Sequence, residues 1–182
     1  MTARPLVSIV MTSYNHASYL SEAIESVRSQ TVDDFELIIV DDASGDNSPA
    51  LIRSYQEKDS RIVPIFHERN SGISKTTNDG FRAARGTYVS YIQSDDRWLP
   101  EKLGKQIAIL RQKPNVVVWT DALIINETGR PTGERFTEKY RSRDKQKSGN
   151  IFHELVVDNY ICGQSMMLRR ELLKAVQFDP RL

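Results

Sequence analysis

The stretch LIIVDDAS, residues 37–44, decides the fold of this chain of 182 residues. Its four apolar residues, most of them β-branched, predict a buried strand, and the two acids that follow mark its end. Two more apolar runs end in polar residues: VSIVM (residues 7–11) leads into TSYN, and YVSYIQS (residues 88–94) leads into Asp95 and Asp96. In an open α/β sheet, ligands bind outside the carboxyl ends of the strands. The three polar ends therefore predict one shared site.

Short apolar runs alternate with amphipathic helical periods over residues 6–112. This alternation is typical of βαβ units, so it predicts a mostly parallel sheet with helices packed on its faces. Strands are predicted over residues 6–11, 36–40, 61–66 and 88–93, and helices over residues 18–29, from residue 47 or 48, over 74–84 and over 100–112.

The pattern weakens after residue 112. Short strands are predicted at residues 116–119 and 165–168, and short helices at 151–157 and 170–176. The segment 126–150 is polar, and its most charged part, residues 138–147, is expected to be a solvated or mobile loop. The functional alternative for residues 138–147 is a basic flap over a phosphate-bearing ligand.

Composition excludes several classes of protein. Hydrophobic residues make up 39% of the chain, and the formal net charge is +1, so no overall field favours nucleic acid. The single Cys162 excludes an internal disulfide and a Cys-rich zinc site, and we expect it to serve packing. His16, His67 and His153 lack metal-ligand spacing and are expected to be surface or packing residues. Neither a signal peptide nor a transmembrane segment is evident, so we expect a cytoplasmic protein.

Several nucleotide-binding and hydrolytic motifs are missing. No Gly-rich fingerprint follows the first strand, no GKS or GKT triplet marks a P-loop, and no G-x-S-x-G elbow occurs. The polar and acidic residues at the predicted strand ends can instead bind the hydroxyls of a ligand and a hard cation. Tyr14 offers a flat ring for stacking on a base, and Asp42 can accept hydrogen bonds from a base or a ribose. Mg²⁺ needs only one or two protein carboxylates, so either acid of the pair Asp95 and Asp96 is a credible ligand.

Each of these residues also has a structural interpretation. An Asp-Asp pair at a strand end is often a turn acid or a helix N-cap, which applies to both acidic pairs. Tyr14 is also compatible with a plain surface aromatic residue.

Taken together, seven segments resemble the inverting family 2 glycosyltransferases of the GT-A fold. They are residues 7–15, 29–31, 35–44, 70–72, 78–80, 84–89 and 94–96. The resemblance implies an α/β GT-A domain, a Rossmann-like mixed sheet flanked by helices, over residues 1–182. Residues 1–112 would form the nucleotide-sugar-binding half. Residues 113–182 would begin the acceptor-side half, which we expect to be incomplete.

The resemblance also implies roles for individual residues around the nucleotide. Thr12 and Tyr14 lie where the family holds the base, and Tyr14 would stack on it. Asp42 matches the acid that reads the base or the ribose. Lys75 is a weaker candidate for the nucleotide pocket, and a solvated lysine in the first turn of a helix is the alternative.

The acidic pair matches the DXD-type motif of the family. Asp95 would lie near the ribose or the donor sugar, and Asp96 would bind Mg²⁺ or Mn²⁺ at the donor diphosphate. The family's general base follows a segment like residues 178–182, so we expect it beyond Leu182. Asp179 lies upstream of that place. Such a truncated chain is expected to bind donor and to transfer poorly or not at all.

The implied activity is that of a hexosyltransferase-like enzyme (EC 2.4). It would move a sugar from a nucleotide-diphosphate sugar, UDP-sugar first, to a saccharide or lipid-linked saccharide with inversion. The expected context is the synthesis of bacterial surface polysaccharide. The expected location is the cytoplasm, with peripheral attachment to the inner face of the membrane as a variant. Two alternatives stay open: a non-catalytic nucleotide-sugar-binding module, and a nucleotidyltransferase, which would need a Gly/Arg-rich first loop.

Overall fold

The computed structural model of the chain describes residues 4–139, 148–151, 153, 155, 159–175, 178 and 179. The first half alternates strands and helices as predicted: β1 (Val7–Ser13), α1 (Ala17–Arg28), β2 (Phe35–Asp41), α2 (Ser48–Lys58), β3 (Ile62–Phe66), α3 (Ile73–Ala83), β4 (Tyr88–Gln93) and α4 (Lys102–Gln112). The second half contains β5 (Leu123–Ile125), β6 (Pro131–Arg135), α5 (Phe136–Lys139), the 3₁₀ helix η1 (Gly163–Ser165), β7 (Met167–Arg169) and the 3₁₀ helix η2 (Arg170–Ala175).

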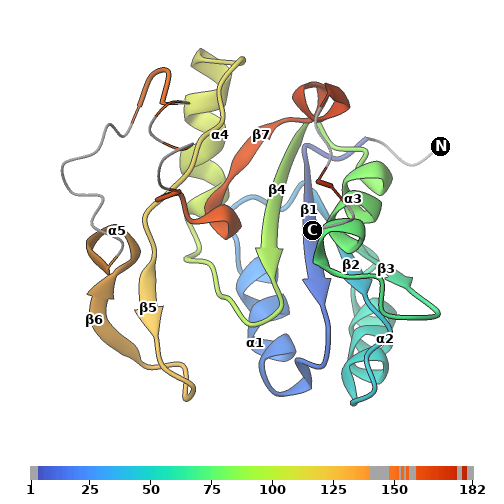
Figure 1. The fold of residues 1–182 in the computed structure, drawn as a ribbon. Helices are drawn as coiled ribbons and strands as arrows, with labels where there is room; N and C mark the ends of the chain where they lie inside the picture. The colour runs from blue at the N-terminus through green and yellow to red at the C-terminus, as the bar shows by residue number, and fades with distance from the viewer. Residues whose placement is uncertain are drawn as a thin grey trace.

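A five-stranded sheet in the order β3-β2-β1-β4-β7 forms the centre of the fold (Figure 1). The strands β1 to β4 are parallel, and β7 pairs antiparallel with β4, where Ser90 faces Met167. The predicted mixed sheet is therefore confirmed. Because β1, β2 and β4 run in the same direction, their polar carboxyl ends meet at one edge, as predicted.

The core lies on both faces of this sheet. Ile9 and Met11 of β1 belong to the larger apolar cluster, which α1, α2 and α4 cover with residues such as Leu20, Ile52 and Leu103. Alternate residues of a strand point to opposite faces. Val10 accordingly belongs to a second cluster, formed with Ile38, Val40, Ala84 and Val89, on the side of α3.

The interior of α3 is in unusually close contact with the sheet at Gly80. A Cβ atom added there would lie 2.3 Å from Cγ1 of Val10 and 3.3 Å from Cγ2 of Val40. Only a residue without a side chain lets the helix axis approach the strands this closely. The position of α3 matters because its first turn forms part of the site described below.

The second half differs from the sequence prediction in several places. Residues 123–139, for which the sequence predicted no helix or strand, form the β5–β6 hairpin and α5. Residues 138 and 139 of the predicted loop belong to α5, and residues 140–147 lie outside the described part of the chain. The predicted strand at 116–119 is reduced to one isolated bridge between Val118 and Met167. The predicted helix at 170–176 is the 3₁₀ helix η2, and most of the predicted helix at 151–157 lies outside the described residues.

A local hydrogen-bond pattern around Asn126 stabilises the turn of the hairpin, and the polar composition of the segment did not indicate it. The side chain of Asn126 accepts hydrogen bonds from the backbone of Thr128 and Arg130, at 3.0 and 2.9 Å, and so closes a turn. Every residue of β6 is exposed, so no apolar alternation marked the strand. Of the helices that the structure describes, none is long and apolar enough to span a membrane.

Candidate functional site

A pocket of about 250 Å³ opens at the carboxyl edge of β1 and β2. It brings together three residues predicted from the sequence, Thr12, Tyr14 and Asp42. Its full lining is Thr12, Ser13, Tyr14, His16, Asp42, Asn70, Gly72, Ile73, Thr76 and Gln93. The pocket therefore combines one aromatic ring with hydroxyl, amide and carboxylate groups, a composition that suits a polar ligand with a flat part.

Two loops interlock on the rim beside Tyr14. The backbone N–H of Asn15 donates to Oγ of Ser44 at 2.9 Å, and Gly45 N–H donates to Oδ1 of Asn15 at 2.8 Å. Asn15 and Ala43 have φ values of 54° and 61°, a left-handed conformation that is strained for alanine. These bonds hold the strained loops in place and leave the Tyr14 side chain 46% exposed.

Two adjacent acids stand at the end of β2, Asp41 as its last residue and Asp42 directly after it, and they make different contacts. Asp41 is a turn acid, because its two carboxylate oxygens accept from the N–H and the hydroxyl of Ser44 at 3.0 and 2.6 Å. Asp42 points to the pocket instead and accepts from the N–H groups of Ser71 and Gly72, both at 2.9 Å. The structural interpretation thus holds for Asp41, whereas Asp42 fastens the loop that precedes α3.

The surroundings of Asp42 also favour its ionised form. Burial on its own opposes the charge, but hydrogen bonds from His67, Ser71, Gly72 and Thr76 outweigh it and lower the pKa of the carboxyl. A carboxylate offers about four acceptor sites, so these contacts use most of its capacity.

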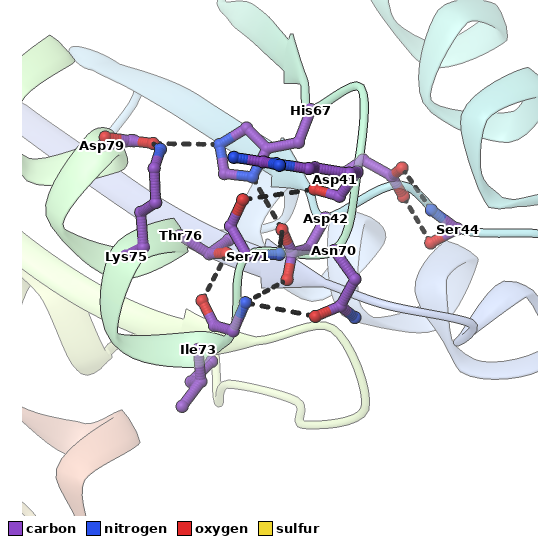
Figure 2. Close-up of polar contacts among 12 residues, drawn as sticks. Asp41, Asp42, Ser44, His67, Asn70, Ser71, Ile73, Lys75, Thr76 and Asp79 are labelled. Carbon is purple, nitrogen blue, oxygen red and sulfur yellow. Dashed lines mark hydrogen bonds and ion pairs between the residues drawn. The ribbon is translucent and has the colours of Figure 1, made fainter. Parts of the chain in front are cut away.

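The position of His67 beside two acids is not evident from the sequence. Its ring lies between two carboxylates (Figure 2): Nδ1 is 2.7 Å from Oδ1 of Asp42, and Nε2 is 3.0 Å from Oδ2 of Asp79 on α3. Asp79 in turn pairs with Lys75 and Arg82. The side chain of His67 is largely buried, in keeping with the expected packing role, and its Nδ1 has a polar partner in Asp42 that the sequence did not indicate. Nε2 lies close to Asp79 but makes no hydrogen bond among the described residues.

Lys75 lies one helical turn from Asp79, and its Nζ contacts Oδ2 of that residue at 2.7 Å. It does not belong to the lining of the pocket described above. Its predicted part in nucleotide binding stays a prediction.

The two hydroxyls at the end of β1 differ in their partners. Oγ1 of Thr12 lies 3.0 Å from the hydroxyl of Tyr91, so it is already engaged. Oγ of Ser13 is buried and has no hydrogen-bond partner among the described residues. Ser13 is thus a further candidate for ligand binding in this pocket. It was not predicted from the sequence, because its buried hydroxyl without a partner is visible only in the structure.

Asp95 and Asp96 line a second cavity, of about 510 Å³, at the same edge of the sheet. Its walls are the first turns of α1, the loop after β4 and the turn of the β5–β6 hairpin: Ser18, Tyr19, Glu22, Asp95, Asp96, Arg97, Ile125, Asn126, Glu127, Thr128 and Gly129. Arg97 connects two of these walls, because it pairs with Glu22 at 2.8 Å and donates to the carbonyl of Gly129. Neither acid caps α4, whose N-cap residue is Glu101.

Asp96 is the perturbed acid of the pair. Burial, followed by the neighbouring charge of Asp95, raises its pKa to about 6, although His16 acts in the opposite direction. Among the described residues, no basic side chain forms an ion pair with either acid, and no group of three His, Cys, Asp or Glu residues is placed to hold a metal. A cation at this point would need oxygens from a ligand as well, and Asp96 fits that demand because a positive charge relieves its unfavourable ionisation.

A segment of the second half contacts the first pocket through Gln93 and packs beside Trp98. Nε2 of Gln164 donates to Oε1 of Gln93 at 2.9 Å, and the indole of Trp98 donates to the carbonyl of Gln164 at 3.3 Å. Cys162, beside this contact, is buried, and burial raises the pKa of its thiol. The thiol is therefore protonated at neutral pH, in keeping with the expected packing role.

Comparison with known proteins gives the family. The sequence model described as "Glycosyl transferase family 2" matches residues 8–176. An uncharacterized glycosyltransferase of Methanocaldococcus jannaschii is 35% identical over 182 residues, which are 98% of this chain and 61% of that protein. The chain spans about half the length of other curated relatives that it matches.

Solved structures agree on the fold. The Staphylococcus aureus protein TarS, residues 1–349 with UDP, superposes with a TM-score of 0.75 and 24% identity over 97% of this chain and 51% of that one. The mannosyltransferase PcManGT of Pyrobaculum calidifontis, with GDP-mannose and Mn²⁺, gives a TM-score of 0.70 and 20% identity over 100% of this chain and 49% of that one. At these identities the likeness shows the fold, and the sequence match shows the rest: the chain belongs to glycosyl transferase family 2 and has the GT-A fold.

Proposed function

We propose that this chain binds a nucleotide-diphosphate sugar, UDP-sugar first, as the donor of a glycosyl transfer. The observation that carries the proposal is the position of the two cavities. The pocket with the exposed Tyr14 ring and the cavity with Asp95 and Asp96 open side by side at the carboxyl edge of one sheet. A nucleotide in the first would direct its diphosphate toward the acids of the second. TarS, which has the same fold, binds UDP.

The pocket residues receive the following roles. Tyr14 stacks on the base and Thr12 lies against it. Asp42 accepts from the base or ribose, which replaces or shares one of the four hydrogen bonds that it accepts in the ligand-free chain. Lys75 leaves its contact with Asp79 to approach the phosphates. Asp95, which is exposed, meets the hydroxyls of the ribose or the donor sugar.

Asp96 is the proposed protein ligand of Mg²⁺ or Mn²⁺, together with the donor diphosphate. Bound there, the cation would offset the charge that develops on the departing diphosphate. Its removal should therefore weaken donor binding. PcManGT, of the same fold, holds Mn²⁺ with its donor.

The acceptor, a saccharide or lipid-linked saccharide, would attack the anomeric carbon from the side of the second cavity and invert it. Four acids line that cavity against one arginine: Glu22, Asp95, Asp96, Glu127 and Arg97. Such a surface favours an uncharged, hydroxyl-rich acceptor over an anionic one. Transfer would also need a general base that takes the proton of the acceptor hydroxyl. We propose no general base among the described residues.

Replacement of Tyr14 tests the proposed base pocket. UDP should bind the wild-type chain, more tightly with Mn²⁺, and Tyr14→Ala should lose about 1–3 kcal/mol of binding free energy because stacking is lost. Tyr14→Phe, which keeps the ring, should bind nearly as well as wild type. Tyr19→Ala is the comparison, since Tyr19 is similarly exposed, at 41%, but lines the second cavity and not the first, so its loss should leave the stacking on the base intact. Isothermal titration gives all four affinities.

Failure of the wild type to bind UDP, GDP or dTDP would refute the proposal. Equal losses of UDP affinity in Tyr14→Ala and Tyr19→Ala would still support nucleotide binding, but they would contradict the position of the base at Tyr14.

Replacement of Ser13 tests whether its buried hydroxyl serves the ligand. Ser13→Ala breaks no hydrogen bond among the described residues, so the free energy of unfolding should stay the same or rise slightly. UDP affinity should fall by about 1 kcal/mol if the hydroxyl bonds the nucleotide. Thermal unfolding and titration of the same sample separate the two effects. Unchanged affinity would exclude Ser13 from the site.

A further inference from the structure

Residues 164–166, at the junction of η1 and β7, are held against the first half of the chain through their backbone. The carbonyls of these three successive residues accept hydrogen bonds from the side chains of Trp98, Gln106 and Ser90, at 3.3, 2.7 and 2.7 Å respectively. Gln106 and Ser90 are each 1% exposed, and Trp98 is 8% exposed. Three consecutive carbonyls that are bonded to buried side chains leave this segment little freedom.

The direction of two of these bonds is set by the ammonium group of Lys102, which lies one turn before Gln106 on α4. Its Nζ is 2.8 Å from Oε1 of Gln106 and 3.2 Å from Oγ of Ser90. A lysine ammonium is a donor only, so the oxygen of the Gln106 amide faces it and the amide nitrogen faces residues 164–166. Ser90 likewise accepts from Lys102 and donates its own proton to a carbonyl of the segment. The side chains of residues 164–166 therefore start from a defined place.

The side chain of Gln164 has a partner at both ends of its amide. Its Nε2 donates to Oε1 of Gln93 at 2.9 Å, and its Oε1 accepts from the thiol of Cys162, whose Sγ is 3.5 Å away. Burial raises the pKa of this thiol, so the thiol keeps its proton and faces the amide oxygen as a donor. Gln164 thus presents its nitrogen to Gln93 and engages the oxygen of the Gln93 amide.

Gln93 lines the first pocket at the end of β4. It is in register with Thr12 on β1, and it shortly precedes Asp95 and Asp96 of the second cavity. Nε2 of Gln93 has no hydrogen-bond partner among the described residues and is not buried, so it is open to a ligand. Because Gln164 engages the oxygen of this amide, the group that Gln93 offers to the first pocket is an N–H donor.

We propose that Gln93 is a specificity-determining residue of the first pocket, and that Gln164, from the second half of the chain, fixes which end of its amide meets the ligand. Gln93 donates to an oxygen of the ribose or the diphosphate, the parts of the nucleotide that extend from the base at Thr12 toward the acids. The contact with the nucleotide rests on the proposed function. The sense of the amide is a property of the ligand-free chain and can be tested without a nucleotide.

The first readout is the exchange of side-chain amide protons with water, measured by NMR. In the ligand-free chain the NH₂ group of Gln164 should exchange more slowly than that of Gln93, because only Gln164 donates a hydrogen bond. Equal exchange, or the reverse order, would overturn the assigned sense of the amide. Saturation with UDP should slow the exchange of the Gln93 group, and unchanged exchange would overturn its contact with the nucleotide.

Two replacements of Gln164, which does not line the first pocket, reverse or release the amide of Gln93. Gln164→Glu offers only acceptor oxygens, so Gln93 must turn its nitrogen to position 164 and its oxygen to the pocket. UDP affinity should then fall about tenfold, the loss of one hydrogen bond to the ligand. Gln164→Met leaves Gln93 free to present its nitrogen and should bind UDP within about threefold of wild type. A purely structural role of Gln164 would instead weaken binding at least as much in Gln164→Met as in Gln164→Glu.

A double-mutant cycle separates the turned amide from the added charge of Gln164→Glu. Gln93→Met removes the donor and should itself weaken UDP binding about tenfold. In that background Gln164→Glu should cause no further loss, because no amide remains to be turned. An equal loss in both backgrounds would indicate plain repulsion of the diphosphate and overturn the proposal.

Uridine in place of UDP locates the partner oxygen. A loss in Gln93→Met that is as large for uridine as for UDP assigns the hydrogen bond to the ribose, and a loss confined to UDP assigns it to the diphosphate. UDP affinity that Gln93→Met leaves unchanged would overturn the role of Gln93 and leave the proposed function standing. A wild type that binds no nucleotide would refute the proposed function and the contact with it, while the exchange order of the two NH₂ groups would still decide the sense of the amide.

Discussion

Asp96→Asn is expected to stabilise the ligand-free chain while it removes the response to Mn²⁺. Burial and the charge of Asp95 raise the pKa of Asp96 from 3.8 to about 6, so its ionisation in the folded chain is unfavourable at neutral pH. A shift of this size corresponds to about 3 kcal/mol. The amide removes the charge with little change in shape, and the free energy of unfolding at pH 7 should rise by about 2–3 kcal/mol.

The pH dependence gives the stabilisation a signature. The folded chain holds the Asp96 proton more tightly than the unfolded chain does, so this residue favours folding below about pH 4. That contribution is lost as the pH rises through about 6. The gain of Asp96→Asn over wild type should therefore be small at pH 4 and appear between about pH 4 and pH 6. Chemical denaturation at a series of pH values measures it.

The matched control for this prediction is Asp95→Asn. Asp95 is exposed, so its replacement should change stability much less. With UDP present, Mn²⁺ should raise the melting temperature of wild type and not that of Asp96→Asn. A variant that keeps the full response to Mn²⁺ would remove Asp96 from the proposed metal site, and a variant less stable than wild type at pH 7 would contradict the account of its buried charge.

Gly80→Ala is expected to destabilise the chain strongly and to disturb the proposed nucleotide pocket. The new Cβ would lie 2.3 Å from Cγ1 of Val10, a distance that real contacts do not show, so α3 must move away from the sheet. Overpacking of this kind costs about 1–3 kcal/mol or more. Because the first turn of α3 forms one wall of the pocket, UDP affinity should fall as well.

Gly104→Ala provides the comparison for Gly80→Ala. Gly104 also lies inside a helix, α4, but a Cβ there would meet Oγ1 of Thr31 at 3.6 Å, an ordinary contact. The better helix propensity of alanine should raise the free energy of unfolding by about 0.5–1 kcal/mol. Thermal and denaturant unfolding of both variants test the pair, and similar stabilities would show that the close approach of α3 is relaxed in solution.

The parts predicted well from the sequence are those with a strong local signal. The runs that became β1, β2 and β4 combine continuous apolar character with an abrupt polar end, and parallel pairing then places Thr12, Tyr14 and Asp42 in one pocket. The hairpin of β5 and β6 escaped prediction because every residue of β6 is exposed and the pattern of burial is absent.

The contacts of His67 could not be predicted for a different reason. Asp42, His67 and Asp79 come from β2, the end of β3 and α3, and no regular spacing in the sequence connects them. Their encounter depends on how closely α3 packs on the sheet. Ser13 was missed because an unpartnered hydroxyl is a property of the folded state and leaves no mark in the sequence.

The walls of the two cavities are encoded by different stretches of the chain. The first pocket is built from residues 12–93, whereas the second takes one wall from the hairpin turn at residues 125–129. Arg97 joins that turn to α1, through the carbonyl of Gly129 and the carboxylate of Glu22. Under the proposed function, insertions or exchanges in the hairpin therefore change the wall of the second cavity and leave the first pocket unchanged. A chimera that carries a relative's hairpin should keep its nucleotide preference and change its product.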